Sequence, residues 1–144
     1  AAQWIRDAVP HTCLYATVDD LKHLYRGGRV SKTSAFLGSA IGIKPILKLN
    51  ETGNLVPCAK VRGRKQSIQT LVKQMEEHIG SFLKENDTVY IECAWFMLEE
   101  ANYLAQLIKE RLGIAKTMIS HIGPVIGSHA GPGALALSFL GENK

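Results

Sequence analysis

One stretch of the sequence combines residue types that can bind an anion. Residues 122–133 hold a single histidine, His129, among four glycines and two prolines. Glycine reaches backbone conformations that other residues avoid and lets the main chain approach a ligand closely, so successive N–H groups can converge on an anion. A histidine in that setting can donate a hydrogen bond to a carboxylate or a phosphate. The alternative is an ordinary tight turn with a half-exposed His129, because glycine and proline are the usual residues of loops.

Two groups of cations stand at positions where an anion can also bind. Arg29 follows Gly27 and Gly28, a pair typical of the residues just beyond a helix. The second group, Arg62, Arg64 and Lys65, stands at an expected junction between a strand and a helix. A solvated corner and an anion clamp are both open interpretations of this group, and a basic residue near a helix end is often only a partner of the helix dipole.

Composition and charge narrow the class of protein. The 144 residues suffice for one domain with a proper core, and 46% are hydrophobic and 21% charged, as in globular proteins. No run of about 18 apolar residues is present, so we expect no stable membrane insertion. The net charge of +4 is scattered along the sequence, which argues against nucleic acid as a partner. Cys13, Cys58 and Cys93 are far apart, as expected of core residues in a reducing compartment, so we expect a cytoplasmic protein.

The pattern of apolar residues predicts strands and helices in a mixed order. The clearest element is an amphipathic helix over 68–83, and the polar loop 50–54 between two apolar runs predicts a β-hairpin. The expected strands are 13–18, 43–49, 55–61, 88–95, 114–120 and 134–140, and the expected helices are 1–9, 19–26, 33–41, 68–83 and 98–112. Two strand–helix–strand crossovers and a hairpin predict an α+β fold, with a two-layer arrangement of a mixed β-sheet and helices mainly on one face.

Common catalytic and cofactor motifs do not fit the chain. Residues 131–136 formally match the dinucleotide-binding fingerprint, but that fingerprint needs a helix at this point and an acidic residue about 20 positions later. A P-loop and a G-x-S-x-G nucleophile elbow are both missing from the sequence. The histidines other than His129 show no metal-ligand spacing, so we expect no metal and no other cofactor.

Several runs of residues, in the same order along nearly the whole chain, resemble the DegV family of bacterial fatty-acid-binding proteins. They are 14–21 (LYATVDDL), 24–31 (LYRGGRVS), 35–38 (AFLG) with 43–47 (IKPIL), 60–65 (KVRGRK) and 122–135 (IGPVIGSHAGPGAL). The resemblance implies that residues 13–144 form the C-terminal lipid-binding domain of such a protein. It also implies that residues 1–12 are the helical remnant of an N-terminal part absent from this chain.

The function implied by the resemblance is that of a carrier rather than an enzyme. Proteins of this family hold a long-chain fatty acid between two domains, and some present it to a separate fatty-acid kinase for phospholipid synthesis. The carboxylate would lie near His129, with Arg29 and Arg62 near the phosphate or the kinase contact. Phe36, Leu37 and Ile126 would form part of one wall of the apolar tunnel, and without the N-terminal domain that wall would be exposed, self-associated or collapsed.

Two other functions remain open from the residues alone. One is a small α/β enzyme that uses His129 as general acid or base, with Arg29 and Arg62 as an anion clamp. The other is a module that docks on a kinase and has no ligand of its own.

Overall fold

The computed structural model describes residues 2–30 and 42–142. Six strands form one sheet in the order β3-β2-β1-β6-β4-β5. The strands are β1 Thr12–Thr17, β2 Ile43–Leu49, β3 Leu55–Arg62, β4 Thr88–Cys93, β5 Lys116–His121 and β6 Leu135–Leu140. The helices are α1 Ala2–Ala8, α2 Lys22–Arg26, α3 Arg64–Ile79, α4 Leu98–Leu112 and α5 Pro124–Ala130, with 3₁₀ turns η1 at Val9–His11 and η2 at Gly80–Lys84.

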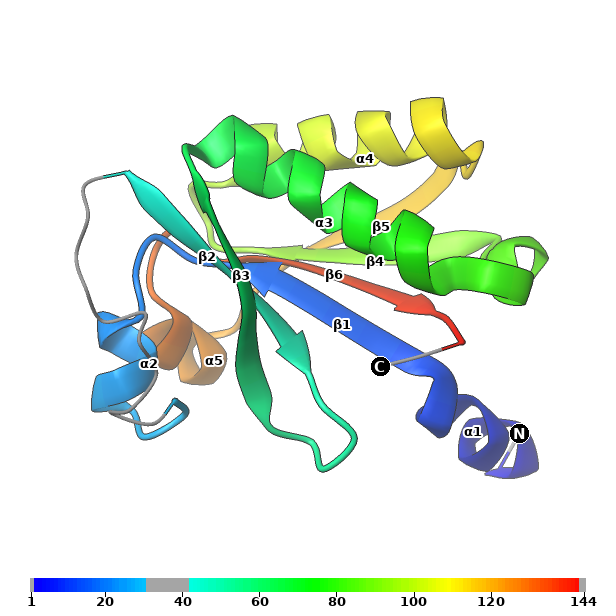
Figure 1. Cartoon of the computed structure of the whole chain (residues 1–144), viewed down its shortest axis with the longest axis horizontal. Helices are drawn as coiled ribbons and strands as arrows, with labels where there is room; N and C mark the ends of the chain where they lie inside the picture. Colours follow the sequence, from blue (N-terminus) through cyan, green and yellow to red (C-terminus); the bar gives the residue numbers. More distant parts are fainter. Residues whose placement is uncertain (1, 31–41, 143–144) are drawn as a thin grey trace.

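Helices α3 and α4 lie side by side over one face of the sheet (Figure 1). The apolar stripe of α3 and that of α4 are buried against the strand residues that point to the same side. This core includes Tyr15, Leu71, Ile91, Leu104 and Leu137, each at most 1% exposed. The prediction of a two-layer α+β fold with helices mainly on one face is therefore confirmed.

The pairing of β1 with β6 lies at the centre of the sheet. It is antiparallel and runs from Thr12 opposite Leu140 to Thr17 opposite Leu135. β4 and β5 form the parallel pair, and the other pairings between neighbouring strands are antiparallel, so the sheet is mixed as predicted. The hairpin of β2 and β3 is also confirmed. Its edge strand carries Pro57 at a register shift, where the missing N–H costs little.

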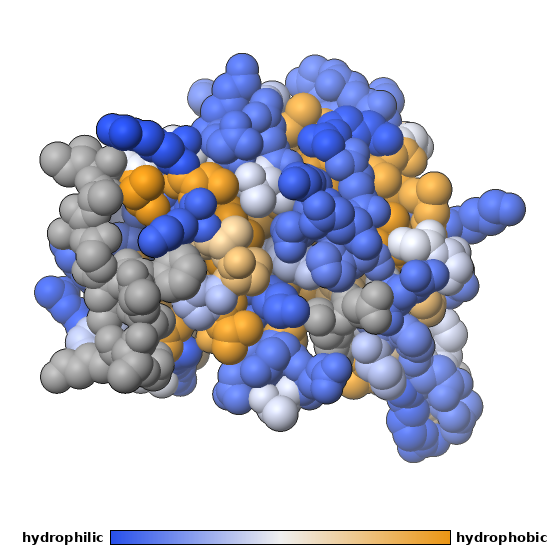
Figure 2. Space-filling view, viewed as in Figure 1, coloured by the Kyte–Doolittle hydropathy of each residue, from blue (hydrophilic) through white to orange (hydrophobic). Residues whose placement is uncertain are grey.

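Among residues 2–30 and 42–142, no helical layer like that of α3 and α4 covers the opposite face of the sheet (Figure 1). Tyr90 and Met118 on this face are 46% and 55% exposed. On the side of the molecule seen in Figure 2, apolar surface forms separate patches among polar residues. Glu92 lies two residues beyond Tyr90 on the same strand, and its Oε2 atom is buried without a hydrogen bond among the described residues. Burial raises the pKa of this carboxyl, despite hydrogen bonds from its own backbone and Ser138.

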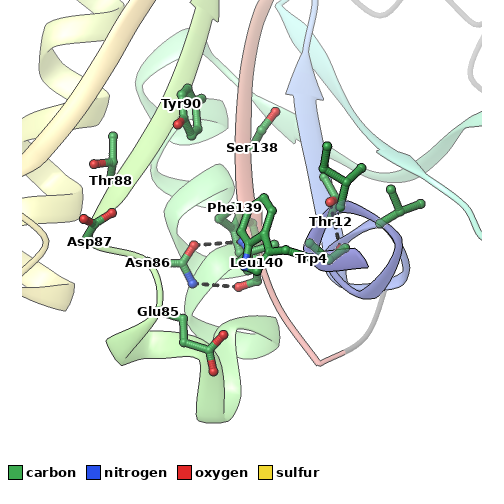
Figure 3. A pocket seen from close by; sticks show the side chains of 13 residues that line it. Trp4, Thr12, Glu85, Asn86, Asp87, Thr88, Tyr90, Ser138, Phe139 and Leu140 are labelled. Atoms are coloured by element: carbon green, nitrogen blue, oxygen red, sulfur yellow. Dashed lines mark hydrogen bonds between the residues drawn. The ribbon is translucent and has the colours of Figure 1, made fainter. Parts of the chain in front are cut away.

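Asn86 joins the turn before β4 to the end of β6. Its side chain donates to the carbonyls of Phe82 and Leu140, each at 2.8 Å, and accepts from the Leu140 N–H at 2.8 Å (Figure 3). The residue is 4% exposed. One buried amide thus satisfies three backbone groups that water does not reach.

Three expectations differ from the structure in detail. The glycine-rich stretch is not only a loop, because α5 occupies seven of its residues from Pro124 onwards. Proline is favourable at a first helical position, where the N–H would have no helical partner. The expected helix over 68–83 is divided, since α3 ends at Ile79 and a 3₁₀ turn begins at Gly80. Cys58 is exposed on the edge strand, whereas Cys13 and Cys93 are in the core as expected.

We expect Asn86→Ala to lower the free energy of unfolding by about 2–4 kcal/mol, because it leaves buried backbone groups without partners. Chemical denaturation of the two proteins measures the difference. The control is Asp87→Ala at the exposed neighbouring position, for which a change within about 0.5 kcal/mol is expected. Equal losses in the two variants would contradict the assignment to the Asn86 side chain.

Glu92→Gln should raise the melting temperature at neutral and alkaline pH but not in acid. The folded protein retains a proton on Glu92 above the ordinary pKa of 4.5, where the unfolded chain has released it. Stability therefore falls as pH rises through the raised pKa, and glutamine removes this loss. In thermal melts from pH 4 to pH 8, the melting temperature of Glu92→Gln should exceed that of the wild type only at the higher pH values. Glu51→Gln in the exposed hairpin loop is the control, and a constant difference at every pH would refute the titration.

Candidate ligand-binding site

The glycine-rich stretch lies at one end of the sheet, next to the segment after β1. The register places Thr17 and Cys93 opposite Leu135, and His121 opposite Cys93. The chain segments after β1, β4 and β5 and the segment before β6 therefore meet at this end. α2 comes after β1 and α5 comes after β5, and the two short helices are in contact (Figure 1).

Helix α2 ends in a Schellman motif. The Arg29 N–H donates to the Leu24 carbonyl at 2.8 Å and the Gly28 N–H donates to the Tyr25 carbonyl at 3.0 Å. Gly28 has φ of +71°, the left-handed conformation that this motif requires. The Arg29 side chain turns back and donates from Nη1 to the Gly27 carbonyl at 2.6 Å. The predicted helix stop is confirmed, and it places the exposed Arg29 guanidinium beside Gly27.

Three close contacts join α2 and the segment before it to the glycine-rich stretch. A Cβ atom built on Gly27 would lie 2.0 Å from Nδ1 of His129, and one built on Gly131 would lie 2.9 Å from Nδ1 of His23. A Cβ on Gly133 would lie 2.2 Å from the carboxyl carbon of Asp19. Each distance is shorter than a carbon atom tolerates, so at all three positions only glycine fits this arrangement.

Asp19 is the centre of a small ion-pair network at this site. It accepts hydrogen bonds from Lys44 Nζ at 2.6 Å and from Arg64 Nη2 at 2.7 Å. Arg64 Nη2 also donates to the Gly133 carbonyl at 2.8 Å. Burial works to raise the pKa of Asp19, but the hydrogen bond from Lys44 and the charge of Arg64 outweigh it and lower the pKa. The network thus ties the start of α3 to the glycine-rich stretch.

The predicted site residues have different positions in the structure. His129 is half-buried in the last turn of α5, and neither ring nitrogen has a hydrogen bond among the residues the structure describes. Arg62 is exposed at the end of β3 and forms no ion pair within 2–30 and 42–142. Ile126 is 63% exposed on α5. Phe36 and Leu37 lie outside the described residues.

A hollow of about 470 Å³ separates α5 from the loop after β4. Its lining includes His23, Trp95, Phe96, Gly127 and Ser128. Trp95 and Phe96 are 71% and 84% exposed, and the Trp95 ring lies 4.5 Å from that of His121. The His129 end of the sheet therefore carries exposed aromatic surface beside the glycine-rich stretch.

A second hollow of about 310 Å³ lies at the opposite end of the sheet (Figure 3). Trp4, Ile5 and Val9 from the N-terminal helical segment form one wall, and residues at the start of β4 and the end of β6 form the other. None of the predicted anion-binding residues lines it.

The described residues include neither a cluster of metal-ligating side chains nor a membrane-spanning helix. Within 2–30 and 42–142, no group of three or more His, Cys, Asp or Glu side chains is arranged to hold a metal ion. In the same part of the chain, no helix has the length and apolar character needed to span a bilayer.

A family model described as "Uncharacterised protein, DegV family" matches residues 1–142. The chain belongs to the DegV family. A DegV domain-containing protein of Clostridium perfringens is 41% identical over 144 residues, which cover 98% of this chain and 47% of that protein. The DegV chain thus spans about half the length of the curated relatives it matches.

Solved structures of DegV proteins share this fold. One is described as DegV, a fatty acid binding protein from Bacillus subtilis; it is 30% identical, with a TM-score of 0.73 over 97% of this chain and 48% of that one. Another is the Streptococcus pneumoniae Fatty Acid Kinase (Fak) B3 protein loaded with linoleic acid. It has a TM-score of 0.82 at 20% identity, and the match covers 98% of this chain and 48% of that one. The second likeness is at the level of fold.

Sequence reasoning missed two residues that the DegV structure places against the glycine-rich stretch. Arg64 rather than Arg62 contacts it, and Asp19 is the carboxylate that holds Arg64 there. The sequence carried one signal for Asp19, since this residue directly follows an expected strand, but the pairing of that strand with β6 was not predicted. Which way the side chains of Arg62 and Arg64 point was not predictable, because it depends on the residues at which β3 ends and α3 begins.

Asp19→Asn should lower the free energy of unfolding at neutral pH by about 1 kcal/mol, since the carboxylate is half-exposed and its two ion pairs are partly screened. The pKa of Asp19 is lowered in the folded protein, so this stabilisation is present above the ordinary value of 3.8 and is lost as pH falls below it. Denaturation at pH 7 and at pH 3 measures the effect. A difference that grows in acid would rule out the ion pairs as its source.

Proposed function

We propose that this chain is the fatty-acid-binding module of a carrier protein, with the fatty-acid carboxylate bound near His129. The observation that carries the proposal is the match along 97% of the chain, at 30% identity, to a Bacillus subtilis protein described as fatty acid binding. The arrangement at the His129 end of the sheet supports it, because an imidazole and a guanidinium both approach Gly27 there.

The chemistry of a fatty acid suits such a site. Removing a carboxylate from water costs several kcal/mol unless hydrogen-bond donors replace the water. A ring N–H of His129 and the Arg29 guanidinium are donors of the required kind, and charge-assisted hydrogen bonds are the stronger ones. Each buried CH₂ of the acyl chain contributes roughly 0.8 kcal/mol, so the chain supplies most of the affinity and the carboxylate sets the orientation.

The two arginines of the predicted site have separate roles in this proposal. Arg29 lies next to the His129 contact and takes part in binding the carboxylate or an acyl phosphate. Arg62 is exposed at a strand end and is accessible to a macromolecular partner. Exposed Ile126 belongs to an apolar surface that the rest of the carrier covers.

The proposed carrier needs more than this chain to enclose a ligand. Its curated relatives are about twice as long, and we propose that an N-terminal domain supplies hydroxyl groups for the carboxylate and the other half of the tunnel. Residues 1–12 would connect that domain to the unit formed by 13–144. A separate fatty-acid kinase is the proposed acceptor of the bound lipid, in keeping with the name of the Streptococcus pneumoniae structure. The site in this chain binds and presents, and the phosphoryl transfer takes place on the kinase.

His129→Ala should weaken binding of linoleate by about 10- to 100-fold, the equivalent of one charge-assisted hydrogen bond. The measurement is a calorimetric titration of the native protein that carries this chain, with the melting temperature recorded in parallel. The melting temperature should change little, because His129 makes no hydrogen bond among the described residues.

The matched control is His11→Ala, which changes a half-buried histidine at the other end of β1. It should leave linoleate affinity within twofold. Unchanged affinity in His129→Ala, or a protein that retains no lipid and binds none, would defeat the proposed function. Native mass spectrometry before and after denaturing extraction establishes whether a fatty acid is bound.

A further inference from the structure

Glycine is required at position 27 by a side chain packed against it and not by the backbone conformation. Gly27 has φ of −79° and ψ of −2°, ordinary helical values that alanine adopts without strain. Gly28, the next residue, has φ of +71°, and no atom of the described residues other than its chain neighbours lies within 4 Å of a Cβ built on it. The two glycines therefore differ in kind. Gly28 provides the left-handed turn, and Gly27 leaves space.

The space beside Gly27 is occupied by the imidazole of His129. A Cβ atom at position 27 would lie 2.0 Å from Nδ1, 2.9 Å from Cε1 and 3.0 Å from Cγ of that ring. Nδ1 is thus the ring atom directed most closely at the α2 backbone, and Nε2 lies on the other side of the ring. With no hydrogen bond to His129 among the described residues, this packing against Gly27 orients the ring.

We propose that Gly27 is a positioning residue for His129: its missing side chain holds the imidazole in the orientation that directs Nε2 towards the fatty-acid carboxylate. The inference rests on the proposed function for the identity of the ligand. The contact itself, between one backbone position on α2 and one ring on α5, is independent of the ligand.

A second contact between the same two segments opposes the movement of α5 away from α2. The His23 ring of α2 packs against Gly131, where an added Cβ would lie 2.9 Å from its Nδ1. Each segment therefore supplies one histidine and one glycine to the other. A methyl group at position 27 must displace either the His129 ring or the whole α5 segment, and the second route disrupts the His23 contact.

A double-mutant cycle with Gly27→Ala and His129→Ala tests the contact. Gly27→Ala alone should lower the melting temperature by roughly 3–9 °C, as overpacking does in a domain of this size. In the His129→Ala background the same change should leave it unchanged or raise it by about 1–3 °C, because alanine is otherwise the better helix residue. If Gly27→Ala alone does not fold, recovery of a folded protein in the double variant answers the same question.

Gly127→Ala is the matched control, since an added Cβ in the middle of α5 would lie 3.9 Å from Ile122 Cγ2, an ordinary contact. Its effect should be the same with and without His129. Equal losses for Gly27→Ala in the two backgrounds would overturn the inference.

The orientation of the ring needs a measurement that general destabilisation does not change. In the wild type, adding linoleate should change the ¹⁵N chemical shifts of the His129 ring. Binding to the protein should likewise change the ¹³C chemical shift of carboxyl-labelled linoleate. Both responses should be lost in folded Gly27→Ala. Retention of both in that variant would overturn the positioning role. A third outcome separates the two proposals. If the effects of Gly27→Ala and His129→Ala on the melting temperature are not additive, but linoleate changes no chemical shift in any variant, the packing contact is established and the proposed function is rejected.

Discussion

The antiparallel pairing of β1 with β6 is the constraint on which the site depends. It joins segments more than a hundred residues apart and fixes Thr17 opposite Leu135. The segment after β1 must then meet the segment before β6, since both leave the sheet at the same end. The first segment contains Asp19 and α2, and the second contains α5 with its glycines. The strand register, rather than any contact in the site itself, brings His129 next to Gly27.

Close approach at this end is what limits the choice of residues. Gly27, Gly131 and Gly133 each lie under a polar side chain of the other segment, and of the three only Gly131 also has a positive φ. Glycine is usually explained by the backbone conformations it permits. At Gly27 and Gly133 glycine is needed because it has no side chain. A Cβ atom at either position would overlap a polar side chain of the other chain segment.

Much of this arrangement was predictable from the sequence, and the failures have physical causes. The apolar period over 68–83 predicted α3, although the helix ends at Ile79, and the polar loop before Leu55 predicted the hairpin, because both signals are local. α5 was missed, since Pro124 and Gly127 are typical of loops unless tertiary packing stabilises a short helix. The motifs that resemble the DegV family predict a site near His129, and this stays a prediction. They did not distinguish Arg62 from Arg64, which depends on where one strand ends.

The distribution of charge at the site bears on how a carrier would release its ligand. Lys44 and Arg64 are already paired with Asp19, and Arg64 Nη2 is further engaged by the Gly133 carbonyl. The other terminal nitrogen of Arg64, Nη1, is buried and has no hydrogen-bond partner among the described residues, so a ligand reaches it only if the site moves. Arg29 is exposed beside the contact between Gly27 and His129, and its Nη1 donates to the Gly27 carbonyl. A carboxylate bound there is met by few strong donors, and tight binding then depends on burial of the acyl chain. In the proposed carrier, opening of the apolar enclosure alone would therefore remove most of the affinity.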